Sequence, residues 1–420
     1  MTVAYKTQNS FRADVLDGHR RHVNLGSARL AELIGTPVEV RAEGNYVFDD
    51  RGDRYLDCGG YGVFTLGHCH PAIIQAVTEQ LNRNPISSRS LVNPEVAKAA
   101  EALSSVAPDG LDYVYFGSTG AEATETALKL ACLKNKTKLI AMHNGYHGKT
   151  IGALGVTGRE SYRTPFRQLL PEVRFVPFGD AVALESELAK QGAESCVILE
   201  PVQAEGGVII PPAGYLSEVQ RLCRRYEAFL ILDEIQTGLG RLGEWWGASR
   251  ERITPDVLLV GKALSGGAVP VSAVVASAFA YEELNRDPLM HTSTFSGNPL
   301  ACAAANATID VFRKQNVVAV AQELGYKLKP VVERLTTGPF APIIREVRAL
   351  GLLIGIEFEA EFLAGDFMVE MLKHKVLVSY SLNAHRVVRL TPPAFLTEAD
   401  ISWLDHALQE SSIAISVRYF

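Results

Sequence analysis

A regular alternation of short apolar runs with amphipathic segments, between about residues 110 and 280, most constrains how this chain can fold. Between two of the runs, Leu216, Val219 and Leu222 recur at helical spacing and give that segment one apolar face. Strands that alternate with helices indicate a mostly parallel sheet covered on both sides, so we expect an α/β protein. The runs predicted to form a seven-stranded sheet are Asp112–Phe116, Lys138–His143, Arg174–Phe178, Cys196–Glu200, Phe229–Asp233, Val257–Gly261 and Val271–Ala276.

The two ends of the chain lack this alternation and are expected to form a smaller α+β domain together. Residues 1–60 would be its N-terminal segment, residues 61–309 the large domain, and residues 310–420 the C-terminal small domain. Its predicted C-terminal elements are strands at Leu352–Phe358, Val376–Tyr380 and Val387–Leu390 and a helix at Glu398–Ser412.

Charge and cysteine usage narrow the expected partners. The net charge is −6 and no long basic run occurs, so the sequence shows no cluster of positive charge of the kind that binds nucleic acids or anionic membranes. The six cysteines form no CxxC pair, which makes a reducing cytoplasm the expected compartment. The N-terminus lacks an apolar signal core. The uncharged stretch around Lys262, from Val257 to Tyr281, contains Pro270 and glycines, and it is interpreted as two buried strands rather than a membrane span.

Two polar residues stand at the carboxyl ends of predicted strands, where ligands bind to parallel sheets. Lys262 ends one apolar run, and desolvation there would lower its pKa and make it a nucleophile able to form a Schiff base. Asp233 ends another apolar run. A lysine for an aldehyde and an acid for a pyridinium nitrogen are the groups expected around pyridoxal 5′-phosphate. Taken singly, each also fits a plain structural role, as a solvated strand end or a loop cap.

Two loops could hold other parts of such a cofactor. The segment Tyr115–Lys129 reads as a strand, a turn of small residues and a helix, whose N-terminus offers free N–H groups to a phosphate or simply carries a capping signal. In Asn144–Thr150, Tyr146 lies between glycines and could stack on a flat ring or pack on the surface.

The ordered set of motifs resembles the class III (ω-amino acid type) aminotransferases, which are fold-type I pyridoxal-phosphate enzymes. The resemblance is collinear from Asp57-Cys58-Gly59-Gly60-Tyr61-Gly62-Val63 to Arg389-Leu390-Thr391-Pro392-Pro393 and covers most of the chain. It implies a large domain with a mostly parallel seven-stranded sheet beside a small α+β domain.

The resemblance also implies roles around the cofactor ring. Lys262 would form the Schiff base with the cofactor and later move a proton, and Asp233 would pair with the pyridine nitrogen. Gln236 would hydrogen-bond the phenolic oxygen. Tyr146 and Ile235 would lie against opposite faces of the ring.

The phosphate and the second subunit follow from the same resemblance. Backbone N–H groups of Gly120 and Ala121 would hold the phosphate, although Ala121 replaces a threonine common in relatives. Ala204 and Ser265 similarly replace common glycines. Thr294 matches a threonine that reaches the phosphate of the neighbouring subunit, so a homodimer with shared sites is expected.

The resemblance assigns substrate recognition to Glu205 and Arg389, and Tyr61 is a further candidate for the substrate pocket. In relatives the Glu205–Arg389 pair closes when an amine without a nearby carboxylate enters, and it opens so that the arginine binds a 2-oxo acid. A plain interdomain salt bridge is the alternative. Val176–Asp180 and Ser381–Ala384 look most like the putrescine and diamine branch, which implies a terminal amine donor and a ping-pong reaction.

Other functions stay open at this stage. An amino-acid epimerase or aminomutase would use Lys262 on the same fold, and a non-catalytic cofactor-binding regulator is a third possibility. His68-Cys69-His70 could suggest a metal site, but it matches the Gly-His-x-His-Pro turn of the family, so no metal is expected.

Overall fold

The computed structural model describes residues 8–338 and 341–419, and its centre is the predicted seven-stranded sheet. The strand order is β4-β10-β9-β8-β7-β5-β6. Only β10 runs antiparallel to its neighbours, because the short connection from β9 cannot make the crossover that a parallel pair requires. The strands are β4 (Leu111–Gly117), β5 (Lys138–Met142), β6 (Val173–Val176), β7 (Ser195–Leu199), β8 (Phe229–Asp233), β9 (Val257–Val260) and β10 (Ser272–Ser277). The mostly parallel sheet is therefore confirmed.

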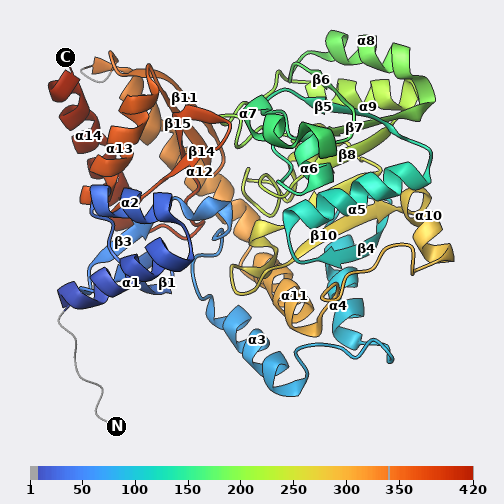
Figure 1. Cartoon of the computed structure of the whole chain (residues 1–420), viewed down its shortest axis with the longest axis horizontal. Helices are drawn as coiled ribbons and strands as arrows, with labels where there is room; N and C mark the ends of the chain where they lie inside the picture. Colours follow the sequence, from blue (N-terminus) through green and yellow to red (C-terminus); the bar gives the residue numbers. More distant parts are fainter. Residues whose placement is uncertain (1–7, 339–340, 420) are drawn as a thin grey trace.

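Helices cover both faces of this sheet (Figure 1). Alternate residues of one strand face two separate cores: Val197 and Leu199 of β7 enter one, and Cys196 and Ile198 enter the other. The first core also contains residues of α3 (Pro71–Arg83), α4 (Pro94–Ser104), α8 (Ala181–Gln191), α9 (Tyr215–Arg225) and α11 (Pro299–Lys314). The second contains residues of α5 (Gly120–Leu133), α6 (Ile151–Val156) and α10 (Ala278–Arg286), and the short α7 (Glu160–Arg163) packs beside α6.

The C-terminal part forms a separate antiparallel sheet in the order β11-β12-β15-β14. Its strands are β11 (Ile344–Leu350), β12 (Leu353–Phe358), β14 (Ser379–Ser381) and β15 (Ala384–Leu390), and its helices are α12 (Val317–Glu333), α13 (Glu361–Lys373) and α14 (Glu398–Tyr419). The strand predicted at Val376–Tyr380 is divided into β13 (Val376–Leu377) and β14, and the predicted final helix is longer than expected.

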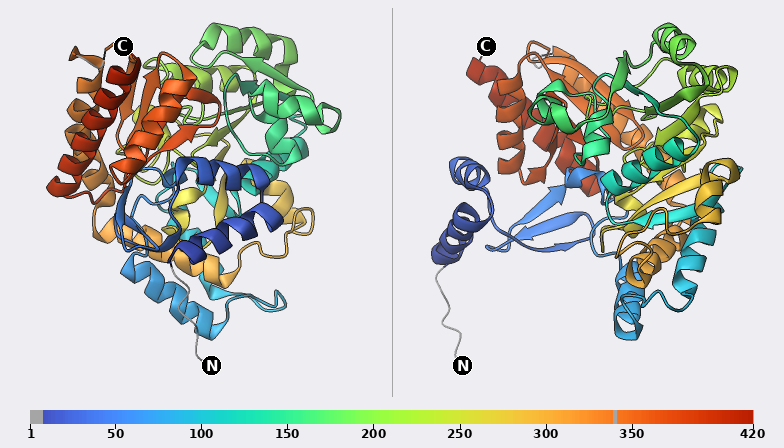
Figure 2. Two further views of the ribbon diagram at one scale, coloured as in Figure 1. Left: turned by 60° about the vertical axis from the view of Figure 1, so that its left-hand side comes forward. Right: turned by 45° about the vertical axis from the view of Figure 1, so that its right-hand side comes forward.

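The two ends of the chain meet through a third sheet. Helices α1 (Gln8–His22) and α2 (Leu25–Ile34) precede β1 (Glu39–Glu43), β2 (Tyr46–Asp49) and β3 (Arg54–Asp57). The parallel pairing of β13 with β3 places Val376 opposite Leu56. Figure 2 shows the α1–α2 hairpin standing away from the large sheet. This pairing agrees with a small domain built from both termini, whereas the boundaries at residues 60/61 and 309/310 stay a prediction.

No helix in the described ranges is long and apolar enough to cross a membrane. The stretch from Val257, uncharged except for Lys262, divides into β9, the turn that carries Lys262, β10 and the start of α10, as expected for buried strands.

Candidate active site

Lys262 and Asp233 lie together at the carboxyl edge of the large sheet. Asp233 is the last residue of β8 and pairs with Leu259 of β9, and Lys262 follows β9 in a short 3-10 turn. Burial lowers the pKa of Lys262 to about 8, opposed by the negative charges of Glu205 and Asp233. A lysine with such a pKa is partly neutral near physiological pH and therefore nucleophilic.

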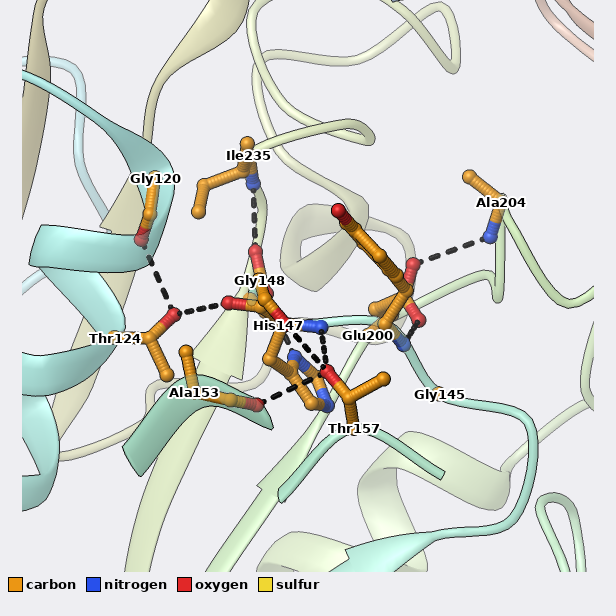
Figure 3. A network of polar contacts seen from close by, with 12 residues as sticks. Gly120, Thr124, Gly145, His147, Gly148, Ala153, Thr157, Glu200, Ala204 and Ile235 are labelled. Carbon is orange, nitrogen blue, oxygen red and sulfur yellow. Dashed lines mark hydrogen bonds and ion pairs between the residues drawn. The ribbon is translucent and has the colours of Figure 1, made fainter. Parts of the chain in front are cut away.

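Asp233 is held by a buried histidine that the sequence analysis did not single out. Its Oδ2 lies 2.7 Å from Nδ1 of His147, and its Oδ1 accepts a hydrogen bond of 3.0 Å from the N–H of Ile235. His147 is itself fixed, since its N–H donates to Thr157 Oγ1 and its carbonyl accepts from Thr124 Oγ1 (Figure 3). The histidine therefore fixes the orientation of the carboxylate. Its place directly after Tyr146, in the loop following β5, was the available sequence signal.

A second buried carboxylate borders this network. Glu200 accepts hydrogen bonds of 3.0 Å from the N–H of Tyr146 and 3.2 Å from that of Ala204 (Figure 3). Burial raises the pKa of Glu200 to about 7, although the nearby His147 acts in the opposite direction. Glu200 thus ties the loop of Tyr146 to the loop that precedes Glu205, a link between distant segments that the sequence did not reveal.

The helix that was expected to hold a phosphate begins at Gly120. A capping box forms there: Thr119 Oγ1 accepts from the N–H of Glu122, whose carboxylate accepts from the N–H groups of Ser118 and Thr119. The N–H groups of Gly120 and Ala121 lie outside this box. The capping and phosphate-binding interpretations are therefore compatible.

Close packing also places Gly120 beside Ile235. A Cβ added at Gly120 would lie 2.8 Å from Cδ1 of Ile235, so no larger residue fits without a shift. The residue expected at the phosphate and a residue expected at the ring face are thus neighbours. The backbone can approach a ligand closely at this point because glycine has no side chain.

Gln236 presents an unused amide in the same region. It is buried, and neither its Nε2 nor its Oε1 has a hydrogen-bond partner within the described part of the chain. Gly62 lies directly against it, and a Cβ added there would overlap the amide. An unsatisfied buried amide is costly, and a ligand oxygen would relieve that cost.

The expected ion pair between Glu205 and Arg389 is present. Their closest atoms, Oε1 and Nη1, are 2.6 Å apart, and both side chains are buried. Burial by itself raises the pKa of Glu205, but the charges of Arg389 and Lys262 and the N–H of Leu382 outweigh it, so that the pKa is lowered. Arg389 lies on β15 of the small-domain sheet, whereas Glu205 follows β7 of the large sheet.

Three other residues from the sequence analysis lie as follows. Tyr61 is largely exposed and has a positive φ of 50°. Thr294 is exposed and lines a surface groove with Arg89, and Lys262 is not among the residues that line this groove. Nε2 of His68 lies 2.8 Å from the Asp57 carboxylate, and no set of at least three ligating side chains suited to a metal occurs in the described ranges.

These residues fit pyridoxal 5′-phosphate. Lys262 would supply an amine for the aldehyde, Asp233 a carboxylate for the ring nitrogen, and Gln236 an unpaired amide for an oxygen. The helix that begins at Gly120 would offer its N-terminal N–H groups to the phosphate, with no side chain in the way at Gly120.

Comparison with known proteins leads to the same chemistry. The model of the family "Aminotransferase class-III" matches residues 33–411. The ornithine aminotransferase of Toxoplasma gondii ME49 is 31% identical, with a TM-score of 0.88 over 99% of this chain and 97% of that one. An omega transaminase from Pseudomonas jessenii, solved in complex with PMP, is 25% identical, with a TM-score of 0.86 over 93% of this chain and 95% of that one. These matches support a transaminase over the isomerases and the regulator that the sequence left open. The chain belongs to the class-III aminotransferases, fold-type I enzymes that use pyridoxal 5′-phosphate.

Proposed function

We propose that this protein transfers an amino group from the terminal primary amine of its donor to a 2-oxo acid, or in reverse onto an aldehyde, by a ping-pong reaction. The buried Glu205–Arg389 pair carries the proposal, because it lies near the reacting amine: the charges of both residues act on Lys262. A paired Arg389 presents no free positive charge to an entering ammonium group. A released Arg389 offers a two-pronged binding site for the carboxylate of an oxo acid. One site can therefore serve both substrates.

The side chains around the cofactor have separate roles in this reaction. Pyridoxal phosphate, when bound, supplies an electron-withdrawing ring that stabilises negative charge on the substrate carbon attached to nitrogen. Lys262 Nζ takes the proton from that carbon and returns a proton in the second step. Asp233, held by His147, keeps a proton on the ring nitrogen. Gln236 binds the phenolic oxygen through its unpaired amide.

The remaining contacts position the cofactor and complete the site. Tyr146 and Ile235 enclose the ring, and the N–H groups of Gly120 and Ala121 bind the phosphate. Thr294 serves the site of a second subunit, so the active form is a homodimer; its exposed position, in a groove that Lys262 does not line, supports this. Tyr61 borders the donor pocket.

The donor is proposed to be a diamine or an ω-amino acid. Ser381–Ala384 and Val176–Asp180 resemble the putrescine and diamine branch, and the 31%-identical Toxoplasma protein is an ornithine aminotransferase. In both putrescine and ornithine the terminal amine lies on a carbon without a carboxylate, which suits a closed Glu205–Arg389 pair.

Visible absorption of the cofactor-loaded protein tests this function. Putrescine, ornithine or alanine is added alone, and 2-oxoglutarate follows. Loss of the visible band with a terminal amine, and its return with the oxo acid, is the expected result. Lys262→Ala is the matched control: it lacks the group that moves the proton, so it should not show this loss and return of the band. A response to alanine alone would refute the terminal-amine donor, and no response to any amine would refute amine transfer.

A further inference from the structure

The loop between β14 and β15 connects the small-domain sheet to the Glu205–Arg389 pair. The N–H of Leu382 donates to Glu205 Oε2 over 2.8 Å, and the N–H of Asn383 donates to the carbonyl oxygen of Glu205 over 2.9 Å. On its other side, the carbonyl of Leu382 accepts from Tyr162 Oη over 2.8 Å, and that of Asn383 accepts from Arg159. The loop is therefore bound to the large domain on both sides.

Asn383 supplies the side-chain contact that holds this loop. It is buried, and its Nδ2 donates to the carbonyl oxygens of Asn144 at 2.9 Å and Gly145 at 3.2 Å. Those two residues directly precede Tyr146. Asn383 thus binds the loop of Tyr146 through its side chain and binds Glu205 through its backbone N–H.

The two partners of the ion pair are held unequally. Glu205 has a well-made backbone hydrogen bond from Leu382 in addition to its contact with Arg389. Within the described residues, Arg389 has the 2.6 Å contact with Glu205 and no further hydrogen-bond partner for its side chain. Glu205 is therefore held in the paired position by the loop as well as by Arg389.

We propose that Asn383 is a positioning residue that holds Glu205 ready to pair with Arg389, and so favours the half-reaction with a carboxylate-free amine. A flexible glutamate loses side-chain freedom when it forms an ion pair, and an anchored one has already lost it. Without the anchor, the closed pair is disfavoured and Arg389 is free more often. The inference rests on the proposed function of the pair.

The two half-reactions, measured separately by rapid-mixing absorption, test the inference. Asn383→Ala removes both amide hydrogen bonds, and Asn383→Asp keeps the size but directs an oxygen at two carbonyls. In both variants the apparent second-order rate constant for the reaction with putrescine should fall about tenfold, whereas that for the reaction with 2-oxoglutarate should change less than about threefold. Asn24→Ala is the matched control: it removes a helix cap in the α1–α2 hairpin and should change neither half-reaction.

Binding of glutarate, an unreactive dicarboxylate, supplies a readout independent of turnover. Glutarate competes with Glu205 for Arg389, so both Asn383 variants should bind it several-fold more tightly than the wild type in a calorimetric titration. Parallel losses in both half-reactions, or weaker glutarate binding, would mean that Asn383 merely stabilises the fold and would overturn the inference. If the wild-type protein itself fails to react with any terminal amine, the proposed function fails instead.

Discussion

Replacing Arg389 by methionine should strongly destabilise the protein by leaving Glu205 buried without its partner. Methionine roughly conserves volume, so little of the effect would come from a cavity. Both side chains are almost completely excluded from solvent, and Glu205 would keep the hydrogen bond from Leu382 but lose its ion pair. Breaking a buried pair in this way costs about 3–5 kcal/mol. In the double variant Glu205→Gln, Arg389→Met neither position carries a charge, and most of the loss should be recovered.

The pH dependence gives this prediction a definite sign. In the wild type the pKa of Glu205 is lowered, so its stabilising contribution is present above its ordinary pKa and disappears as the pH falls through the lowered value. Without Arg389, burial is opposed only by Lys262 and the N–H of Leu382, and we expect it to raise that pKa; the penalty is then present at high pH and relieved as the pH falls through the raised value.

Urea unfolding of the cofactor-loaded proteins, followed by circular dichroism at about pH 8 and about pH 5, measures both effects. The deficit of Arg389→Met should be larger at the higher pH, and the double variant should show no such difference. Additive losses in the double variant, or a deficit independent of pH, would refute the account of a buried, unpaired carboxylate.

Three further perturbations have defined outcomes. The rate at which cofactor-free protein binds added pyridoxal phosphate should rise with pH and level off above about 8, since the pKa of Lys262 is lowered to about 8. Stopped-flow absorption measures this rate, and a rate that does not vary with pH would contradict the lowered pKa. Gly120→Ala should weaken cofactor retention about tenfold or more in dialysis, because its Cβ would lie 2.8 Å from Ile235, whereas Gly18→Ala, with nothing within 4 Å, should have no effect. Thr294→Ala should also weaken retention but leave the free energy of unfolding of the cofactor-free protein within about 0.5 kcal/mol, as expected for a side chain exposed in its own subunit. Equal retention would contradict its role across the dimer.

The strands and the positions of Lys262 and Asp233 at their ends were predictable from local sequence. A strand buried on both faces needs a continuous apolar run, so the run from Phe229 to Leu232 marks β8 and its end, and the run from Val257 to Val260 marks β9. The parallel order of these strands then places both polar residues at the same edge of the sheet.

Contacts between distant segments were not predictable in this way. His147 lies on the loop after β5 and meets Asp233 only because β7, between their strands, brings the two loops to one edge. Its position beside Tyr146 points to the loop, but no local pattern marks a histidine for contact with Asp233. The roles taken from family resemblance named Asp233 and omitted the residue that holds it.

What the sequence by itself determined is the series of buried strands and the chemistry available at their ends, because burial and periodicity are local properties of the chain. Only the tertiary structure decided how the small domain meets the large one. The contacts of Arg389 with Glu205 and of Asn383 with the loop of Tyr146 depend on how β15 and the hairpin before it pack against the large sheet. That packing is set by the combined shape of many side chains, so no single motif specifies it.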